Sequence, residues 1–159
     1  MSIYVFGYGS LINMNNNIEL TNFLNKKIYP VIVKGLKRSL NVAGRNHKVF
    51  GVKDVKTSLC NGILFKVNNK DLKYLIERES LYTIKNIDKN RINFSYDKHI
   101  NFNINDKIYC FYPEPKYILN KKNINNLPIS KKYLNICKQG SSFIGNNFLQ
   151  DFISMSIII

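Results

Sequence analysis

The 159-residue chain has few cysteines, few histidines and few acidic residues. Cys60, Cys110 and Cys137 lie far apart and are odd in number, which excludes a disulfide framework and a cysteine-based metal cluster. We expect each to be a small buried side chain in a reduced, cytoplasmic protein. His47 and His99 share no ligand spacing, so we interpret both as surface residues and predict no metal site.

The chain also lacks long hydrophobic runs. No apolar run approaches the roughly 20 residues that a membrane-spanning helix needs. The apolar tail, residues 153–159, is far shorter, and we expect it to pack on the body of the protein or to form a partner surface. No secretory leader is expected, because the chain runs from Met1 and Ser2 directly into a strand. The length and the 45% hydrophobic content predict a single folded domain over residues 1–159.

Acidic residues are outnumbered, since 10 Asp and Glu face 24 Lys and Arg, for a formal net charge of +14. Such a charge is typical of proteins that bind nucleic acid or anionic membranes. The lysines are scattered, however, and no block reaches the five or so like charges that mark a binding arm. We therefore interpret the charge as a solvated basic surface that helps to attract small anionic substrates. We expect no nucleic-acid and no membrane partner.

What the chain does have is a glycine-rich segment close to its beginning. Residues 3–6 are β-branched and aromatic, as is typical of a strand, and Gly-Tyr-Gly-Ser-Leu follows at residues 7–11. Gly7 and Gly9 allow backbone angles closed to other residues and let a ligand approach main-chain N–H groups. A tight turn without a ligand is the alternative. Dinucleotide and P-loop motifs are absent, because Ile12 replaces a required glycine and no Gly-Lys-Ser/Thr follows.

The remaining pattern predicts an α+β fold. Strand-like runs lie at residues 29–33, 37–42, 60–67, 81–84, 92–96 and 107–112. Helices are expected at 18–25, from Asn68 to Glu79, from a Ser130 cap to Ile144, and at 146–153. This irregular order favours a curved or barrel-like sheet over a layered parallel one.

One carboxylate falls on the apolar face of the helix expected after Asn68. Three apolar residues have the spacing of one helix face: Leu72, Leu75 and Ile76. Three positions further on, Glu79 continues this face, whereas Glu77 faces water. A buried carboxylate without a partner has a raised pKa, which suits a general base. The alternatives are that Glu79 turns out to solvent at the helix end, or pairs with Arg78 or a lysine.

Four segments together resemble the γ-glutamylcyclotransferase family. Residues 6–11 (Phe-Gly-Tyr-Gly-Ser-Leu) resemble its Tyr-Gly-Ser loop, and residues 61–65 (Asn-Gly-Ile-Leu-Phe) resemble its glycine-containing strand. Residues 75–82 (Leu-Ile-Glu-Arg-Glu-Ser-Leu-Tyr) resemble its Leu-Asp-x-Arg-Glu-x-x-Tyr motif, with Ile76 in place of the acidic residue. Residues 133–140 resemble its closing helix, in which Tyr and Gly are seven apart. The four segments keep the family's order across nearly the whole chain.

The resemblance implies a fold, a site and a reaction. The fold is a small barrel-like mixed β-sheet with flanking helices, and the family needs no metal or organic cofactor. Glu79 is implied as the catalytic general base, Tyr133 as a hydrogen-bond partner of the substrate, and Tyr82 as a pocket residue. The implied substrate-binding loop consists of Gly7, Tyr8, Gly9, Ser10 and Leu11.

The implied reaction is the intramolecular aminolysis of a γ-glutamyl amide, which gives 5-oxoproline and a free amine or amino acid. Glutathione, a γ-glutamyl amino acid and a γ-glutamyl amine all stay open as substrates, and so do a monomer and a homodimer. Two other classes of protein also stay open. One is a non-catalytic module that binds a γ-glutamyl-type ligand, and the other is a basic nucleic-acid-binding barrel that uses lysines and exposed aromatic residues.

Overall fold

The structure is a computed structural model that describes residues 1–14, 20, 23 and 25–158. In this part of the chain the strands are β1 (Ile3–Gly7), β2 (Ile28–Ala43), β3 (Lys48–Val67), β4 (Tyr82–Asn86), β5 (Ile92–Asn93), β6 (Lys107–Pro113) and β7 (Ser156–Ile157). The helices are η1 (Ser10–Asn13), α1 (Asn69–Arg78), η3 (Lys89–Arg91), η4 (Pro115–Tyr117), η5 (Ile124–Asn126), α2 (Lys131–Ile144) and α3 (Asn146–Ser154). The helix expected at residues 18–25 falls largely outside the described residues.

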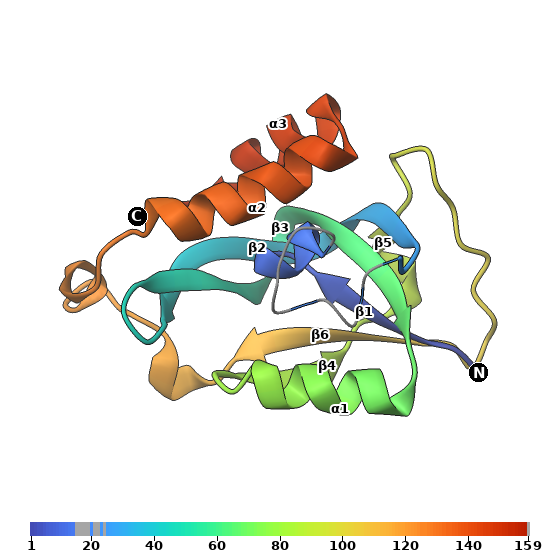
Figure 1. Cartoon of the computed structure of the whole chain (residues 1–159), viewed down its shortest axis with the longest axis horizontal. Helices are drawn as coiled ribbons and strands as arrows, with labels where there is room; N and C mark the ends of the chain where they lie inside the picture. Colours follow the sequence, from blue (N-terminus) through green and yellow to red (C-terminus); the bar gives the residue numbers. More distant parts are fainter. Residues whose placement is uncertain (15–19, 21–22, 24, 159) are drawn as a thin grey trace.

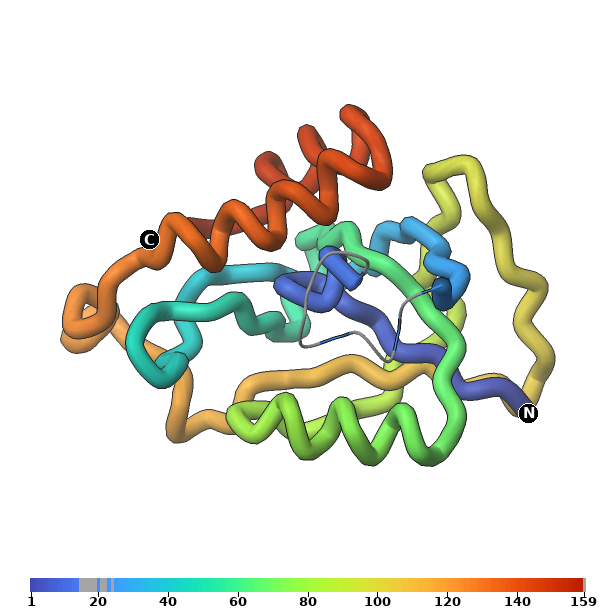
Figure 2. The backbone as a smooth tube through the Cα atoms, viewed as in Figure 1, coloured from blue at the N-terminus to red at the C-terminus, as the bar shows by residue number. Residues whose placement is uncertain are grey.

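These strands form a mixed sheet in the order β4-β6-β1-β3-β2-β5, and β7 pairs with β2. The first strand, β1, runs through the centre of the molecule, parallel to β6 and antiparallel to β3 (Figure 2). Its side chains Val5 and Phe6 are fully buried, because both neighbouring strands and the helices cover it. The predicted α+β fold with a mixed sheet and flanking helices is confirmed. As far as the chain is described, β4 and β5 are the two ends of this order, so the barrel-like sheet stays open.

A long hairpin of β2 and β3 bends the sheet. Residues 29–33 and 37–42, expected as two strands, belong to the single strand β2, because Gly35 forms a β-bulge instead of a turn. Gly35 has φ +76°, which favours glycine, and the pairing register shifts beside it. The strand β3 is also longer than expected. Its first part, residues 48–59, carries many polar side chains and shows no clear apolar alternation.

The strand expected at residues 92–96 is reduced to β5, Ile92–Asn93. After it, Phe94 and Tyr96 pack against the core through their side chains instead of continuing the pairing. The aromatic residues that predicted a strand are therefore present because their side chains pack against the core, and not because the backbone continues the sheet.

The predicted helix starts are confirmed by their caps. The Asn68 side chain accepts from the Asp71 N–H (2.8 Å), and the Asp71 carboxylate accepts from the Asn68 N–H (3.2 Å). The Ser130 hydroxyl accepts from the Tyr133 N–H (3.1 Å) and fixes the start of α2. Figure 1 shows α2 and α3 on one side of the strands and α1 on the other. The end of the chain, up to Ile158, returns to the body, where β7 pairs with β2.

The core is mostly apolar, but the described residues include a few buried polar ones, among them Asn61, Ser141 and one arginine. The three cysteines are buried, as expected. Arg38 on β2 is fully buried as well, and the sequence pattern did not predict this. Its guanidinium donates to the carbonyls of Tyr8 and Asn61, at 3.2 and 2.6 Å, and to the carbonyl of Phe152 at 3.1 Å.

Among the described residues, no helix has both the length and the apolar character to cross a membrane.

Candidate active site

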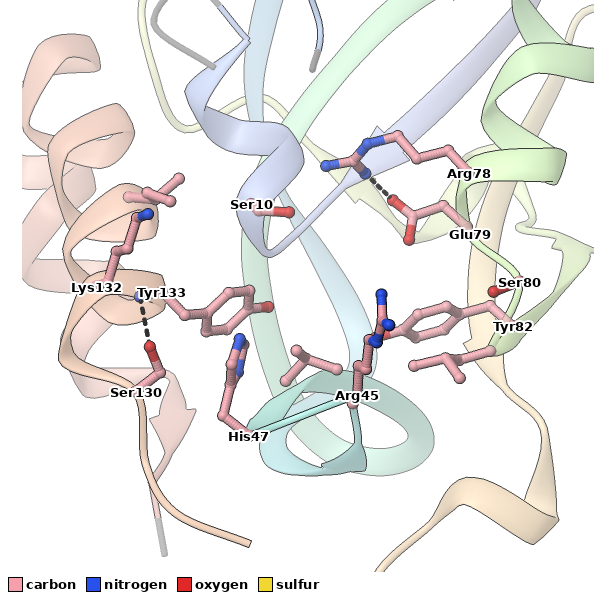
Figure 3. Close-up of a pocket in the computed structure, with 14 residues that line it drawn as sticks. Ser10, Arg45, His47, Arg78, Glu79, Ser80, Tyr82, Ser130, Lys132 and Tyr133 are labelled. Atoms are coloured by element: carbon pink, nitrogen blue, oxygen red, sulfur yellow. Dashed lines mark hydrogen bonds and ion pairs between the residues drawn. The ribbon is translucent and has the colours of Figure 1, made fainter. Parts of the chain in front are cut away.

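A cavity of about 610 Å³ opens between the start of α2, the end of α1 and the turn that joins β2 to β3 (Figure 3). A recess of about 30 Å³ lies beside it, against the aromatic side chains of β1, β3 and β6. Four residues line both spaces: Ser10, Glu79, Tyr82 and Tyr133. The two spaces therefore form one site, with a wide outer part and a small inner one.

The loop after β1 forms one wall of the inner recess. At Gly7, a Cβ atom would lie 2.7 Å from Leu11 Cβ, so a glycine lets the chain turn closely into η1. At Gly9, a Cβ atom would lie 3.1 Å from the Tyr133 hydroxyl, so glycine leaves room for that group. Neither glycine has a positive φ. Close approach is the reason for glycine at both positions, and at Gly9 the backbone (φ −124°, ψ −124°) also has the unusual angles expected from the sequence.

The structure places Glu79 in the cavity and Glu77 in solvent. The Glu79 side chain is 16% exposed and lines both the outer cavity and the recess. The cause differs from the expected helix face, because Ile76 on that face is 42% exposed. Glu79 follows Arg78, the last residue of α1, and its backbone (φ −92°, ψ 57°) has already left the helical conformation. The end of the helix, and not its apolar face, turns this carboxylate inward.

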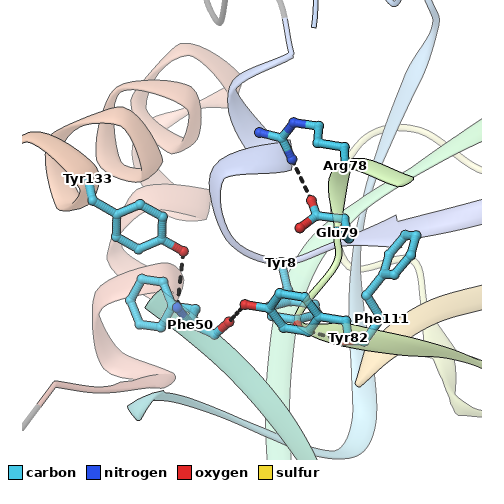
Figure 4. Close-up of polar contacts among 7 residues, drawn as sticks. All are labelled: Tyr8, Phe50, Arg78, Glu79, Tyr82, Phe111 and Tyr133. Atoms are coloured by element: carbon cyan, nitrogen blue, oxygen red, sulfur yellow. Dashed lines mark hydrogen bonds and ion pairs between the residues drawn. The ribbon is translucent and has the colours of Figure 1, made fainter. Parts of the chain in front are cut away.

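Glu79 has a charged partner within the site. Its Oε1 lies 2.5 Å from Nη1 of Arg78 (Figure 4). A neighbouring cation favours the ionised form of a carboxylate. Glu79 is therefore a paired carboxylate, and of the alternatives left open by the sequence the structure shows the one in which Glu79 pairs with Arg78.

Two tyrosines are fixed on the same residue of β3. The Tyr82 hydroxyl donates to the Phe50 carbonyl (2.6 Å), and the Phe50 N–H donates to the Tyr133 hydroxyl (3.0 Å). Figure 4 shows the two rings on either side of Phe50. Because both anchors are backbone atoms of a paired strand, the hydroxyl positions are set by the sheet. The Tyr133 hydroxyl accepts this hydrogen bond and keeps a proton that it can donate to a ligand.

Burial decides the protonation of these hydroxyl groups. It raises the pKa of Tyr133 well above its ordinary value, and it raises the pKa of Tyr82, with a further contribution from the charge of Glu79. Both groups stay neutral near pH 7 and act as hydrogen-bond donors or acceptors rather than as bases. In the described lining of the cavity and the recess, Glu79 is the only carboxylate. Of the two lining groups that can act as a general base near neutral pH, the His47 imidazole lines only the outer cavity, whereas Glu79 also lines the inner recess.

The structure separates the predicted loop residues into two groups. Gly9, Ser10 and Leu11 line the inner recess, together with the ring of Tyr8. The Tyr8 hydroxyl, however, donates to the Phe111 carbonyl (2.6 Å) and is engaged in the core. Gly7 is absent from the described lining and acts through the tight turn. The substrate-binding role of the others stays a prediction.

Sequence reasoning named Arg78 only as a possible partner of Glu79 and missed the other basic residues of the site. Arg45, Lys132 and Arg78 line the outer cavity, and His47 lies beside the Tyr133 ring, with 5.4 Å between the ring centroids. His47 is thus half-buried in the cavity wall, which corrects its interpretation as a surface residue. Since 24 Lys and Arg are spread along the chain, no local pattern distinguishes these three. Only the position of Arg78 next to Glu79 offered a signal.

The described residues hold no cluster of three or more His, Cys, Asp or Glu side chains that could bind a metal ion. Neither a protein-family model nor a curated protein matches the chain.

Several solved structures share the fold. YkqA from Bacillus subtilis has a TM-score of 0.69 and 15% sequence identity, over 98% of this chain and 56% of that one. The chain thus spans just over half the length of YkqA. A γ-glutamyl cyclotransferase has a TM-score of 0.67 and 13% identity, over 99% of this chain and 89% of that one. A yeast γ-glutamyl cyclotransferase specific to glutathione has a TM-score of 0.61 and 13% identity, over 97% and 95%. This chain therefore has the fold of γ-glutamyl cyclotransferases.

Proposed function

We propose that the protein is a cytoplasmic γ-glutamylcyclotransferase-type enzyme that cleaves a small γ-glutamyl amide by intramolecular aminolysis. One observation carries the proposal. Glu79, the only carboxylate in the described lining, faces a recess formed by the loop after β1, Tyr82 and Tyr133. The shared fold and the four sequence motifs support the same reaction. The enzyme needs no nucleophile of its own, because the substrate carries one.

The proposed reaction starts from a γ-glutamyl amide with its α-ammonium group near Glu79. The carboxylate removes one proton, and the freed amine attacks the γ-carbonyl carbon. A new C–N bond closes a five-membered ring and gives a tetrahedral intermediate. The proton on Glu79 passes to the leaving nitrogen as the former amide C–N bond breaks. The ring nitrogen then gives its remaining extra proton to the Glu79 carboxylate, which passes it to the released amine. The products are 5-oxoproline and the amine in its ammonium form, and Glu79 returns to its ionised form.

Positioning supplies much of the acceleration in this scheme. Ring closure requires the γ-glutamyl chain to fold over itself, and a small rigid recess favours that conformation. Well-oriented intramolecular reactions gain roughly 7–11 kcal/mol from such positioning. The Tyr133 hydroxyl and the N–H groups at the start of η1 are the proposed donors to the substrate. A single donor to a developing oxyanion contributes roughly 2.7–4 kcal/mol.

Arg78 has two proposed roles in the same scheme. Its guanidinium holds the Glu79 carboxylate in one position and favours the ionised form that accepts the proton. It also brings a positive charge close to the place where the α-carboxylate of the substrate lies when the ammonium group contacts Glu79.

The test is the identity of the product. Purified protein is incubated with glutathione, γ-glutamyl amino acids and γ-glutamyl amines in H₂¹⁸O, and the products are measured by mass spectrometry. We expect 5-oxoproline without ¹⁸O, in equal amount to the released amine. Glutamate with ¹⁸O indicates hydrolysis and contradicts the proposal. Ligand binding without any release by folded protein points to a binding module. Salt-sensitive binding of single-stranded oligonucleotides without release points to the nucleic-acid-binding barrel.

A further inference from the structure

The outer cavity is strongly basic. Its described lining contains three cationic residues, Arg45, Arg78 and Lys132, and one carboxylate, Glu79. Arg78 is used at the inner end, where it pairs with Glu79. Arg45 and Lys132 lie farther out, and both are exposed. The outer part of the site therefore presents positive charge to whatever extends beyond the recess.

Two different elements carry these outer cations. Arg45 lies in the turn between β2 and β3, which is closed by a hydrogen bond from the Gly44 N–H to the His47 carbonyl (3.1 Å). Lys132 lies in the first turn of α2, directly before Tyr133. Both residues line the outer cavity, and Figure 3 shows Arg45 on the side of Tyr82 and Lys132 on α2, with the Tyr133 ring between them. Among the described residues, no acidic side chain forms an ion pair with either of them.

The sizes of the two spaces indicate where each half of the substrate lies. The inner recess, at about 30 Å³, has room only for part of a γ-glutamyl group. The leaving half must then lie in the outer cavity of about 610 Å³, beside Arg45 and Lys132. A carboxylate there gains charge-assisted hydrogen bonds, which are the strong ones in proteins. A neutral amine gains none, and a cationic amine is repelled.

We propose that this enzyme prefers γ-glutamyl amides whose leaving amine carries a carboxylate, and that Arg45 and Lys132 determine this preference. The favoured substrates are γ-glutamyl amino acids and peptides, and the disfavoured ones are γ-glutamyl derivatives of simple amines. The inference rests on the proposed function, since it assigns the leaving half of the substrate in that reaction.

A matched pair of substrates tests the preference. γ-Glutamyl-alanine and γ-glutamyl-ethylamide differ only in the carboxylate of the leaving amine. We expect kcat/KM to be at least about tenfold higher for γ-glutamyl-alanine, because a single charge-assisted hydrogen bond is strong enough to produce a difference of that size. In the double variant Arg45→Met/Lys132→Met, the ratio should fall to about twofold or less, chiefly because γ-glutamyl-alanine is cleaved less efficiently. Methionine keeps the apolar part of each side chain and removes the charge.

The control variant is Lys131→Met. Lys131 is the exposed neighbour of Lys132 on α2 and does not line the cavity. The Lys131→Met variant removes one positive charge from the same helix turn and should leave the ratio of kcat/KM for the two amides unchanged. A fall of the ratio in this variant would show that overall charge, and not the two cavity residues, sets the preference.

The outcomes separate the inference from the proposed function. Equal turnover of both amides by the wild type overturns the preference, and an unchanged ratio in the double variant overturns the assignment to Arg45 and Lys132. If folded wild type cleaves neither amide, the proposed reaction fails. Isothermal titration calorimetry with the same two amides then decides the recognition. Tighter binding of γ-glutamyl-alanine that disappears in the double variant supports it, and equal or absent binding of both amides refutes it.

Discussion

At the scale of single residues, Arg38 is the least expected feature of the core. Its guanidinium has no carboxylate partner among the described residues, and carbonyl groups, the Asn61 side chain and the Ser156 hydroxyl surround it instead. The guanidinium carbon lies 4.1 Å from the centroid of the Phe152 ring. Burial lowers the pKa of Arg38, but arginine starts so high that it stays charged. The residue joins the loop at Tyr8 to β3, α3 and β7.

Replacement of Arg38 by methionine should therefore destabilise the fold. Arg38→Met keeps the apolar stem but removes the guanidinium donor from the Tyr8 carbonyl and from both oxygens of Asn61, while the Phe152 carbonyl still accepts from the Ser156 hydroxyl. Each buried unsatisfied acceptor costs about 1–3 kcal/mol, so we expect the free energy of unfolding to fall by roughly 3 kcal/mol or more. Urea denaturation followed by circular dichroism measures it. Lys34→Met, an exposed change on the same strand, should shift it by less than about 0.5 kcal/mol. Equal stability of both variants would refute this role of Arg38.

At the scale of elements, the contact between α2 and η1 positions two walls of the site. A Cβ atom at Gly140 of α2 would lie 2.7 Å from the Asn13 Cα atom of η1. The Asn13 side chain also donates to the Ile136 carbonyl (2.8 Å). Because the close neighbour is backbone, it cannot rotate away. This contact fixes Tyr133 on α2 relative to Ser10 on η1.

Gly140→Ala separates helix propensity from packing. Alanine inside a helix is more favourable than glycine by about 1 kcal/mol, so propensity alone predicts a more stable protein. We expect the opposite, a loss of about 1–3 kcal/mol, because α2 must move away from η1. KM for the γ-glutamyl substrate should rise as well. Gln139→Ala, an exposed change next to it, is the control for both quantities. A Gly140→Ala protein more stable than wild type would contradict the proposed packing.

The elements also show how far the sequence predicts the fold. Helices with caps and strands with strong apolar content were expected correctly, because their signals are local, as at Asn68 and Ser130. The continuity of β2 through Gly35 was not, since a glycine in a strand pattern signals a turn and a bulge equally well. The first half of β3 was missed as well. It is a strand because β2 pairs with it, and a pairing partner is not visible in a local pattern.

At the scale of the whole molecule, the fold brings together segments that are far apart in the sequence. The loop after β1, the end of α1 and the start of α2 meet at one cavity, with the β2–β3 turn at its rim. Motifs predicted Glu79, Tyr82 and Tyr133 at this site. The cations Arg45 and Lys132 could not be predicted, because their role follows only from where the hairpin turn and α2 meet.

The net charge of +14 extends the positive potential beyond the cavity. A basic molecule with a basic cavity concentrates small anions near the site, and this long-range attraction is screened by salt. The charge thus favours an anionic substrate without requiring a nucleic-acid partner. Within this basic site, the proposed general base is Glu79, the only carboxylate of the described lining.

The most direct test of this claim compares Glu79→Gln with Glu77→Gln. Both changes remove one negative charge close to the end of α1, but only Glu79 lines the cavity. We expect 5-oxoproline release by Glu79→Gln to fall by at least about 10²-fold, the lower end of what a general base contributes, with the fold unchanged by circular dichroism. Glu77→Gln should keep nearly full activity. Equal activity of the two variants, whether both retain it or both lose it, would contradict the account.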